Sequence, residues 1–381
     1  MRRTEKFSNF IGIFLKGKKT ARGVLLAPFF RHSSFVRFRA FAGEKRKELV
    51  ILDSDMMEFY DDGAAMLLLA LSAKIDLLGV TLVTGNNWIE SETAFTLRQL
   101  EAVGLEKKVP VFVGSSLPLR EGRIEGMKEE RELFGFGRDN MLGAGRLSRP
   151  QSWQSEYRSL YHREPLMLPS NKDAVDFIIE TVKEHPNEVT IAAIGPCTNI
   201  AKAVLRAPEI VPLIKRIVYM AGAFFQEGNV THSAEFNCWF DPEAAKITFR
   251  TPFNEQIIVP LDVCEKVRFT EKRFEKAEKI IKTPVLREMM DRDFRKTMFK
   301  EKRESESFIW DLLAAAIIVD PTIITEEVTL PVDVNDTFSL SYGQAVVFKG
   351  GAPQGTQKAR IILSVDEKKL WNLLFDAFRK M

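Results

Sequence analysis

The chain has 381 residues, of which 45% are hydrophobic and 28% are charged, and its formal net charge is +3. This length and composition are typical of a soluble protein with one large α/β domain or two smaller ones, and no apolar run is long enough to predict a membrane-spanning helix. Most of the positive excess lies in residues 1–47, so the remainder is near neutral or slightly acidic and gives nucleic-acid binding little support.

Residues 1–47 form a basic segment that differs in kind from the rest of the chain. It is rich in Arg, Lys and Phe, and Glu5 and Glu44 are its only acids. Its apolar stretches are short for a secretory signal, and Arg31 interrupts the second of them. We expect a flexible or targeting extension, which leaves a cytoplasmic location as the main expectation and an organelle as the alternative.

Four aspartates follow the first predicted strand, residues 49–52. They are Asp53, Asp55, Asp61 and Asp62. The short apolar run before them is typical of a buried central strand, and residues 63–71 behind them predict a helix. Acids at the carboxyl end of a strand lie where open α/β sheets bind their ligands. Because four carboxylates repel one another there, a hard divalent cation with oxygen ligands is the simplest explanation.

The rest of the chain alternates predicted strands and helices. Strands are expected at residues 78–83, 109–113, 188–194, 217–220 and 256–261, and helices at 90–103, 171–184, within 270–306 and at 310–319. These units predict an α/β fold, with a mostly parallel central sheet and helices on both faces, in a single domain spanning residues 48–381. Residues 114–169 lack clean periodicity, so we expect a mobile loop or lid insertion over the site.

Polar residues recur where these strands end. Asn86 follows the second strand, Ile194 and Gly195 follow the fourth, and an expected hairpin carries Asn229, Glu235 and Asn237. Each set alone is a weak signal, because an isolated Asn at a strand end is usually a turn residue. Together they place acids and amides on one rim of a sheet, where they suit a cation and a polyhydroxylated ligand such as a sugar.

Five stretches, in this order, make the chain resemble the calcium-dependent nucleoside hydrolases, the inosine-uridine-preferring ribohydrolase family. They are Asp53-Ser54-Asp55 with Asp61-Asp62; Gly79-Val80-Thr81 with Gly85-Asn86; Ala193-Ile194-Gly195-Pro196 with Thr198-Asn199-Ile200-Ala201; Gly228-Asn229 and Ala234-Glu235-Phe236-Asn237 with Asp241-Pro242-Glu243-Ala244-Ala245; and Trp310-Asp311 ahead of Asp320-Pro321. The resemblance covers essentially the whole chain after residue 47.

The resemblance implies a role for each matching residue. Ca²⁺ is expected to bind Asp55, Asp62, Asp311 and the backbone carbonyl of Ile194, with Asp53 orienting this cluster. Asp55 is also expected to take the proton from a water that the metal activates. The residues expected to bind ribose are Asp61, Asn86, Asn229, Glu235, Asn237 and Asp311. Acids around the sugar would favour the positive, oxocarbenium-like transition state of glycosidic cleavage.

Two departures from the family pattern bear on these roles. Residues 56–60 separate Asp55 from Asp61, two residues more than the usual pattern has. Trp310 stands where many members carry a histidine that protonates the leaving base, and purine-preferring members similarly use a tryptophan that stacks on the base. A core position for Trp310 is the alternative, because an apolar helix follows it. His232, in the expected hairpin, is a second group that we consider for the leaving base.

These observations predict an enzyme that hydrolyses the N-glycosidic bond of ribonucleosides, favours purine nucleosides and serves purine salvage. One alternative is a calcium-containing relative that binds nucleosides or sugars without catalysis. Another is a haloacid-dehalogenase-like phosphatase, whose nucleophile pair Asp53 and Asp55 would match, although the chain has no Gly-Asp dipeptide for its Mg²⁺ motif. The expected partners are a small nucleoside and further copies of the chain in a dimer or tetramer, with no nucleic acid and no membrane.

Overall fold

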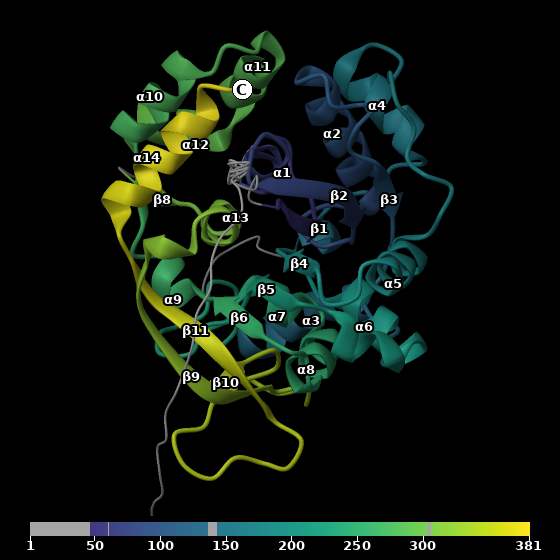
Figure 1. The fold of residues 1–381 in the computed structure, drawn as a ribbon, viewed down its shortest axis with the longest axis vertical. Coiled ribbons are helices and arrows are strands. Elements are labelled where there is room, and N and C mark those ends of the chain that lie inside the picture. Colours follow the sequence, from purple (N-terminus) through teal and green to yellow (C-terminus); the bar gives the residue numbers. More distant parts are fainter. Residues whose placement is uncertain (1–45, 60, 136–142, 303–305) are drawn as a thin grey trace, which may run out of the picture. The chain divides into compact units, whose positions relative to one another are not determined.

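Strand β1 (Glu48–Ser54) runs through the middle of the central sheet (Figure 1). The structure is a computed structural model that describes residues 46–59, 61–135, 143–302 and 306–381, so nearly all of the expected basic extension lies outside the described residues. From Val50 to Ser54 the strand is fully buried, as expected for a strand covered on both faces. Val50 and Leu52 pack into one hydrophobic cluster and Ile51 into another, so each face of β1 contributes to a different core.

In the described ranges, the main sheet has nine strands in the order β10-β9-β11-β6-β5-β4-β1-β2-β3. The strands after β1 are β2 (Ile75–Leu82), β3 (Val111–Val113), β4 (Val189–Ala193), β5 (Arg216–Met220), β6 (Gln256–Val259), β9 (Ile324–Val334), β10 (Ala345–Val347) and β11 (Gln357–Val365). Among the described strand pairs of this sheet, only those of β9 with β11 and with β10 are antiparallel, which confirms the prediction of a mostly parallel sheet. Strand order reverses between β1 and β4, and sheets of this kind bind ligands at such a switch point.

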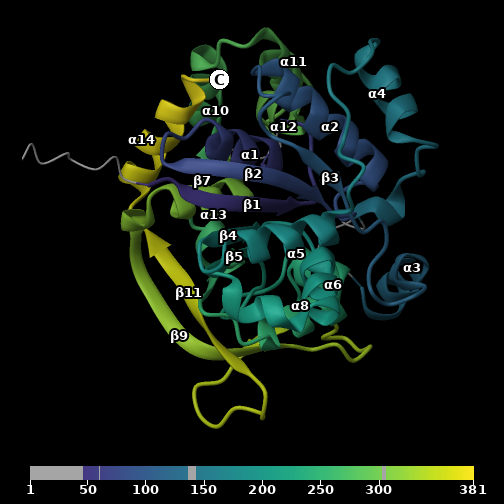
Figure 2. The ribbon, with the colours of Figure 1, turned by 45° about the vertical axis from the view of Figure 1, so that its right-hand side comes forward.

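Helices cover both faces of the sheet (Figure 2). On one face lie α1 (Asp62–Ala70), α2 (Ile89–Ala102), α4 (Trp153–Tyr161), α9 (Leu261–Cys264), α10 (Glu271–Ile280), α11 (Pro284–Arg292), α12 (Phe294–Lys300), α13 (Asp311–Val319) and α14 (Glu367–Phe378). On the other lie α5 (Ala174–Glu184), α6 (Thr198–Arg206), the 3₁₀ helix η2 (Pro208–Leu213) and α8 (Pro242–Arg250). A two-stranded sheet pairs β7 (Arg268–Thr270) with β8 (Glu306–Phe308). No helix within these residues is long and apolar enough to cross a bilayer.

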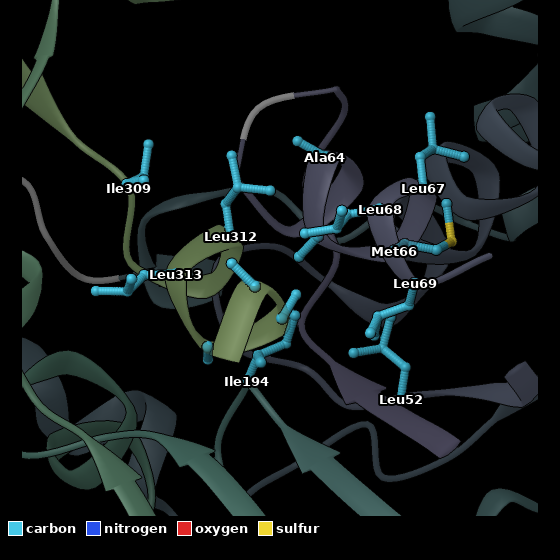
Figure 3. Packing of buried hydrophobic residues seen from close by; sticks show 14 of the residues in the cluster. Leu52, Ala64, Met66, Leu67, Leu68, Leu69, Ile194, Ile309, Leu312 and Leu313 are labelled. Carbon is cyan, nitrogen blue, oxygen red and sulfur yellow. The ribbon is translucent and has the colours of Figure 1, made fainter. Parts of the chain in front are cut away.

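Two helices are buried all round, α1 and α13, and they pack against each other (Figure 3). Every residue of α13 is buried, which matches its uniformly apolar sequence. Leu68 of α1 and Leu312 and Leu313 of α13 belong to the same hydrophobic cluster as Leu52 of β1. Both helices begin with an aspartate, so their packing also fixes where two carboxylates lie.

Much of residues 114–169, which we expected to be loop, is helical. The segment holds α3 (Arg123–Phe134), the 3₁₀ helix η1 (Gly143–Arg146) and α4; residues 136–142 are not described. Helix α4 starts with a capping box in which Ser152 and Ser155 bond reciprocally, and it packs on α2. Helix α3 buries Arg123 and Glu130 as an ion pair. A buried charged pair breaks the apolar periodicity by which a helix is recognised in sequence.

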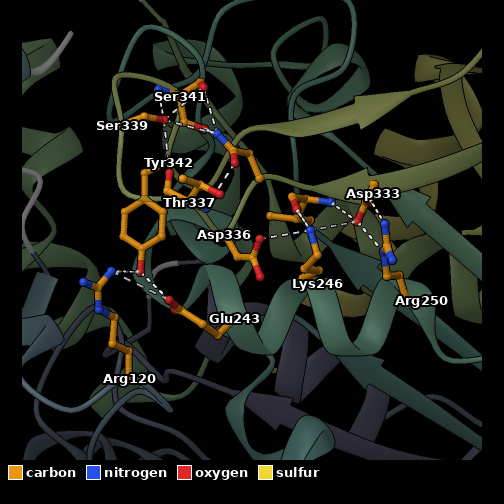
Figure 4. Close-up of polar contacts among 12 residues, drawn as sticks. Arg120, Glu243, Lys246, Arg250, Asp333, Asp336, Thr337, Ser339, Ser341 and Tyr342 are labelled. Carbon is orange, nitrogen blue, oxygen red and sulfur yellow. Dashed lines mark hydrogen bonds and ion pairs between the residues drawn. The ribbon is translucent and has the colours of Figure 1, made fainter. Parts of the chain in front are cut away.

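The C-terminal part adds the antiparallel edge of the sheet. The loop between β9 and β10 is tied to α8 by polar contacts (Figure 4): Tyr342 donates a 2.6 Å hydrogen bond to Glu243, and Lys246 pairs with Asp336 at 3.0 Å. These contacts hold the edge strands in place and lie away from the residues predicted for the site.

Candidate active site

The ends of β1 and β4 meet at the switch point of the sheet. Asp53 pairs with Ala193 across the two strands, and the backbone N–H of Ile194 donates to the Asp53 carbonyl at 2.9 Å. The next residue is glycine because a Cβ at Gly195 would lie 2.7 Å from the Asp55 nitrogen and 2.8 Å from its Oδ1. The sheet therefore brings Asp55 and the Ile194–Gly195 turn together, as the sequence predicted.

Asp61 joins the N-termini of the two buried helices. Its carboxylate accepts hydrogen bonds from the backbone N–H groups of Trp310 (2.7 Å), Asp311 (2.9 Å) and Leu312 (3.1 Å). These N–H groups have no partner within α13, and the positive end of the helix dipole favours a carboxylate there. Asp61 thus caps α13 from outside the helix and fixes Asp311 next to α1.

The long segment between Asp55 and Asp61 is anchored at both ends. Met56 and Phe59 are buried in the core, and Gln99 donates a 3.1 Å hydrogen bond to the carbonyl of Met57. Met56 and Phe59 therefore tie this longer segment to the core, and Asp61 and Asp62 lie at the start of α1.

The other three aspartates each have a neutral hydrogen-bond donor. Thr81 and Asn199 donate to Oδ1 of Asp53 at 2.5 and 2.8 Å. The Asn86 N–H donates to Oδ2 of Asp55 at 2.8 Å, and the Ser54 hydroxyl donates to Oδ1 of Asp62 at 2.8 Å. Among the described atoms, Asp53 Oδ2, Asp55 Oδ1 and Asp311 Oδ1 are buried and accept no hydrogen bond. Buried oxygens of this kind are costly unless another group approaches them.

Burial and mutual repulsion raise the pKa of these carboxyls. Burial raises the pKa of Asp53 to about 6 and, helped by the charges of Glu235 and Asp53, that of Asp55 to about 7. Burial also raises the pKa of Asp62, with the charge of Asp55 as the next cause, and that of Asp311, with the charge of Asp62 as the next cause. A positive charge among them would remove this penalty.

Glu235, Asn229 and Asn237 follow β5 in the chain, and they lie on a bend and a short helix rather than on the expected hairpin. Glu235 caps α7 (Phe236–Phe240): its oxygens accept from the N–H groups of Asn237 (2.8 Å) and Cys238 (3.1 Å). Asn237 donates to the carbonyls of Ile194 and Met220, both at 2.9 Å, and so ties the ends of β4 and β5 together. The expected hairpin was wrong because the capping Glu and the buried Phe236 face start a helix.

A cavity of about 340 Å³ opens above these groups, a size within the usual range for small-molecule sites. The described residues that line it are Met57, Asp61, Asp62, Asn86, Asn87, Gly143, Arg146, Ile194, Met220, Asn229, Glu235, Phe236, Asn237, Phe294, Trp310 and Asp311. Trp310 is half-buried: it lines the cavity and also packs against the main hydrophobic cluster, so the structure agrees in part with each of the two expectations for it.

Three residues of the prediction lie elsewhere. Asp53 and Asp55 are not among the described lining residues; both are buried beneath the wall, and a Cβ at Gly85 would lie 2.3 Å from Asp55 Oδ2. His232 is exposed, has its ring nitrogen 3.6 Å from Glu227, and does not belong to the described lining. Within the described part of the chain, no histidine lines the cavity.

The sequence reading missed several residues of the site. Glu92 on α2 is fully buried, accepts a 3.2 Å hydrogen bond from the Gly85 N–H, and lies close enough to Asp55 and Asp62 for their charges to raise its pKa. In the sequence, Glu92 is marked only by its place in the predicted helix, six residues after Asn86, which is a weak signal. Arg146 and Gly143 come from the insertion, and no pattern in the sequence places that insertion against the sheet.

Carboxylates and a carbonyl are the donors that calcium prefers, and the orphaned oxygens of Asp55 and Asp311 fit such a cation. As the side chains stand, however, no three Asp, Glu, His or Cys groups within the described residues are arranged as a finished metal site. One oxygen of Asp55 accepts a hydrogen bond from Asn86, and one oxygen of Asp62 accepts one from Ser54.

Comparisons with known proteins point to one family. The family model for inosine-uridine preferring nucleoside hydrolases matches residues 50–372. The inosine-uridine preferring nucleoside hydrolase of Leishmania major is 28% identical over 87% of this chain and 98% of its own, and the pyrimidine-specific ribonucleoside hydrolase RihB of Escherichia coli O1:K1 / APEC is 29% identical over 88% and 98%. A solved structure, the purine-preferring ribonucleoside hydrolase of Gardnerella vaginalis, superposes with a TM-score of 0.68 at 25% identity, covering 87% of this chain and 98% of that one.

Proposed function

Because this chain belongs to the inosine-uridine preferring nucleoside hydrolase family and is an N-ribohydrolase, we propose that it hydrolyses purine ribonucleosides with the help of a bound Ca²⁺ ion. The observation that carries the proposal is the group of buried carboxylates, Asp55, Asp62 and Asp311, which lie at the sheet's switch point close enough for their charges to raise one another's pKa.

The residues that would hold Ca²⁺ are Asp55, Asp62, Asp311 and the carbonyl of Ile194. The orphaned oxygens of Asp55 and Asp311 and the repulsion among the acids support this assignment; the carboxylates would have to rotate to complete the ligand set. When bound, the ion supplies positive charge that lowers the pKa of a coordinated water.

The remaining steps belong to the protein. Asp55 would hold the ion through one oxygen and is the carboxylate that would accept a proton from the coordinated water, as a general base does. Asp311, Glu235 and Asn237 line the cavity where the ribose would lie. Their negative charge and amide oxygens favour the positive charge that develops on the sugar as the C1′–N bond lengthens. Asp61 keeps Asp311 in place through its three bonds to α13.

The aromatic groups of the cavity support a preference for purines. Trp310, Phe236 and Phe294 line it, and no histidine does so within the described residues. The departure of the base must therefore be assisted by interactions other than protonation by a histidine. Aromatic stacking is one of them, and its free energy grows with the area of the base, which is larger for a purine. The names of the relatives allow a preference for purines or for pyrimidines, since the Gardnerella vaginalis enzyme is purine-preferring and the Escherichia coli enzyme is pyrimidine-specific.

A panel of nucleosides tests the proposal. The purified protein in CaCl₂ is incubated with inosine, guanosine, adenosine, uridine and cytidine, and free base and ribose are measured. We expect hydrolysis of the purine nucleosides with a kcat/KM about ten-fold or more above that of uridine, which equals about 1.4 kcal/mol. Equal or faster turnover of uridine would refute the purine preference, and no turnover of any nucleoside would refute the calcium-assisted hydrolysis.

A further inference from the structure

The charges around the cavity are separated between its floor and its rim. The floor carries Asp62, Glu235 and Asp311, all of them buried. The rim carries Arg146, which is exposed, and Phe294, which is 54% exposed. Among the lining residues that the structure describes, Arg146 is the one with a positive charge.

Arg146 belongs to a short element that is fixed on both sides. On the N-terminal side, the Ala144 N–H donates to the Gly85 carbonyl at 2.8 Å, and Gly143 approaches so closely that a Cβ there would lie 2.3 Å from the same oxygen. On the C-terminal side, the Trp88 indole donates to the Leu147 carbonyl at 2.9 Å. The element η1 therefore packs against the turn that carries Asn86. These contacts hold the backbone of Arg146 at the cavity.

This layout of charge matches the bond that the reaction breaks. Water oxygen forms a bond to C1′, the C1′–N9 bond breaks, and its electron pair goes to the base. One water proton goes to Asp55, the other stays on the new ribose hydroxyl, and the departing base takes a proton from solvent. Positive charge thus develops on the sugar, above the acids of the floor, and negative charge develops on the base, towards the rim.

We propose that Arg146 is a specificity-determining residue that binds the acceptor edge of the departing base and selects 6-oxopurine nucleosides, such as inosine and guanosine. This inference rests on the proposed function and adds the identity of the base. A guanidinium has donors and no acceptor, and the O6 and N7 atoms of a 6-oxopurine form the two-acceptor edge that arginine binds through two parallel hydrogen bonds. Adenine carries an amino donor in place of O6, and pyrimidines have no N7.

Arg146 would act on the departing base without donating a proton to it. Its guanidinium remains charged at any working pH, so it stabilises negative charge on N7 and O6 rather than protonating the base. Two hydrogen bonds to a group that becomes charged strengthen as the bond breaks, which raises kcat as well as affinity.

The test is a substrate panel on the full chain in CaCl₂ with wild type and Arg146→Gln. The substrates are inosine, 7-deazainosine, adenosine and p-nitrophenyl β-D-ribofuranoside, whose phenolate leaves without an N7/O6 edge. Arg158→Gln is the matched control, because Arg158 is an exposed arginine of the same insertion that pairs with Glu164 and is not in the described cavity lining.

We expect Arg146→Gln to lower kcat/KM for inosine about 30-fold, equal to about 2 kcal/mol, and to change that for the p-nitrophenyl riboside less than about three-fold. The ratio of inosine to 7-deazainosine should also shrink in the variant, whereas Arg158→Gln should match wild type on every substrate. Equal losses on all four substrates, or no loss on inosine, would overturn the role of Arg146. A wild type that cleaves none of them, including the p-nitrophenyl riboside, would instead overturn the proposed function.

Discussion

The buried acids should give the metal-free protein an unusual dependence of stability on pH. Burial raises the pKa of Asp53 from 3.8 to about 6 and that of Asp55 from 3.8 to about 7. Between pH 5 and pH 8 the folded state therefore holds protons that the unfolded state has released. The free energy of unfolding must then fall as pH rises, because it increases with pH only where the unfolded state binds more protons.

The size of the effect follows from the same two values. From pH 5 to pH 8 the linkage relation gives a loss of about 1–2 kcal/mol for Asp53 and about 2–3 kcal/mol for Asp55, so about 4 kcal/mol for the pair. Asp62 and Asp311, whose pKa values are also raised by burial, act in the same direction. Carboxyls with lowered pKa, such as Asp333, have already ionised by pH 5 and contribute little within this window.

The assay is urea denaturation at pH 5, 6, 7 and 8, with EDTA or with CaCl₂. In EDTA we expect the fall of about 4 kcal/mol; in CaCl₂ we expect the sign to reverse, because ionised carboxylates bind the ion and protons compete with it. Asp53→Asn is the matched variant, since Thr81 and Asn199 both donate to Oδ1, which an asparagine retains. It should remove about a third of the fall. A metal-free protein whose stability is level or rises from pH 5 to pH 8 would refute this reasoning.

Three substitutions address the roles of single residues. Asp55→Asn should lower kcat about 10³-fold, the size expected for loss of a general base, while circular dichroism stays native; substantial activity at saturating calcium would contradict the role of Asp55. Asn237→Ala should reduce kcat/KM alike for inosine and uridine, and should lower stability by about 1–3 kcal/mol because the carbonyls of Ile194 and Met220 lose a buried donor; a loss confined to one base would move Asn237 out of the sugar site. Trp310→Ala should lower inosine turnover about ten-fold more than uridine turnover, and an unchanged ratio of the two would count against stacking.

The parts of the fold with regular apolar patterns could be predicted from sequence. The strand before the aspartates and the helices starting near residues 62, 89 and 311 appear within a few residues of their expected positions. The C-terminal strands β9 and β11 were not foreseen, because many of their residues are exposed or half-buried and their pattern is mixed. Strand β11 is nonetheless needed to continue the sheet next to β6.

The structure brings several of the residues predicted for the site to one cavity, whereas their contacts were not foreseen. Several residues of the stretches that carry the family resemblance line one cavity: Asp61, Asp62, Asn86, Ile194, Glu235 and Asp311. Their local partners could not be foreseen: the sequence does not show that Asp61 caps α13 from another helix, or that Asn237 ties two strand ends together. Such hydrogen bonds depend on how elements pack, which one-dimensional patterns do not encode.

Arg146 is a cavity residue that the sequence patterns did not indicate. Its neighbours in sequence have no helical or strand periodicity, and its place at the cavity depends on the docking of η1 onto the carbonyl of Gly85. A residue brought in by an insertion is found only once the insertion has a position in space.

The most direct measurement is the release of hypoxanthine from inosine by protein that has been treated with EDTA, dialysed and shown to be metal-free, before and after addition of CaCl₂. We predict no release above background without calcium and recovery of turnover on its addition, saturating as the site fills. Full-rate release by the metal-free protein, or no release in either state, would contradict the account of a calcium-assisted nucleoside hydrolase.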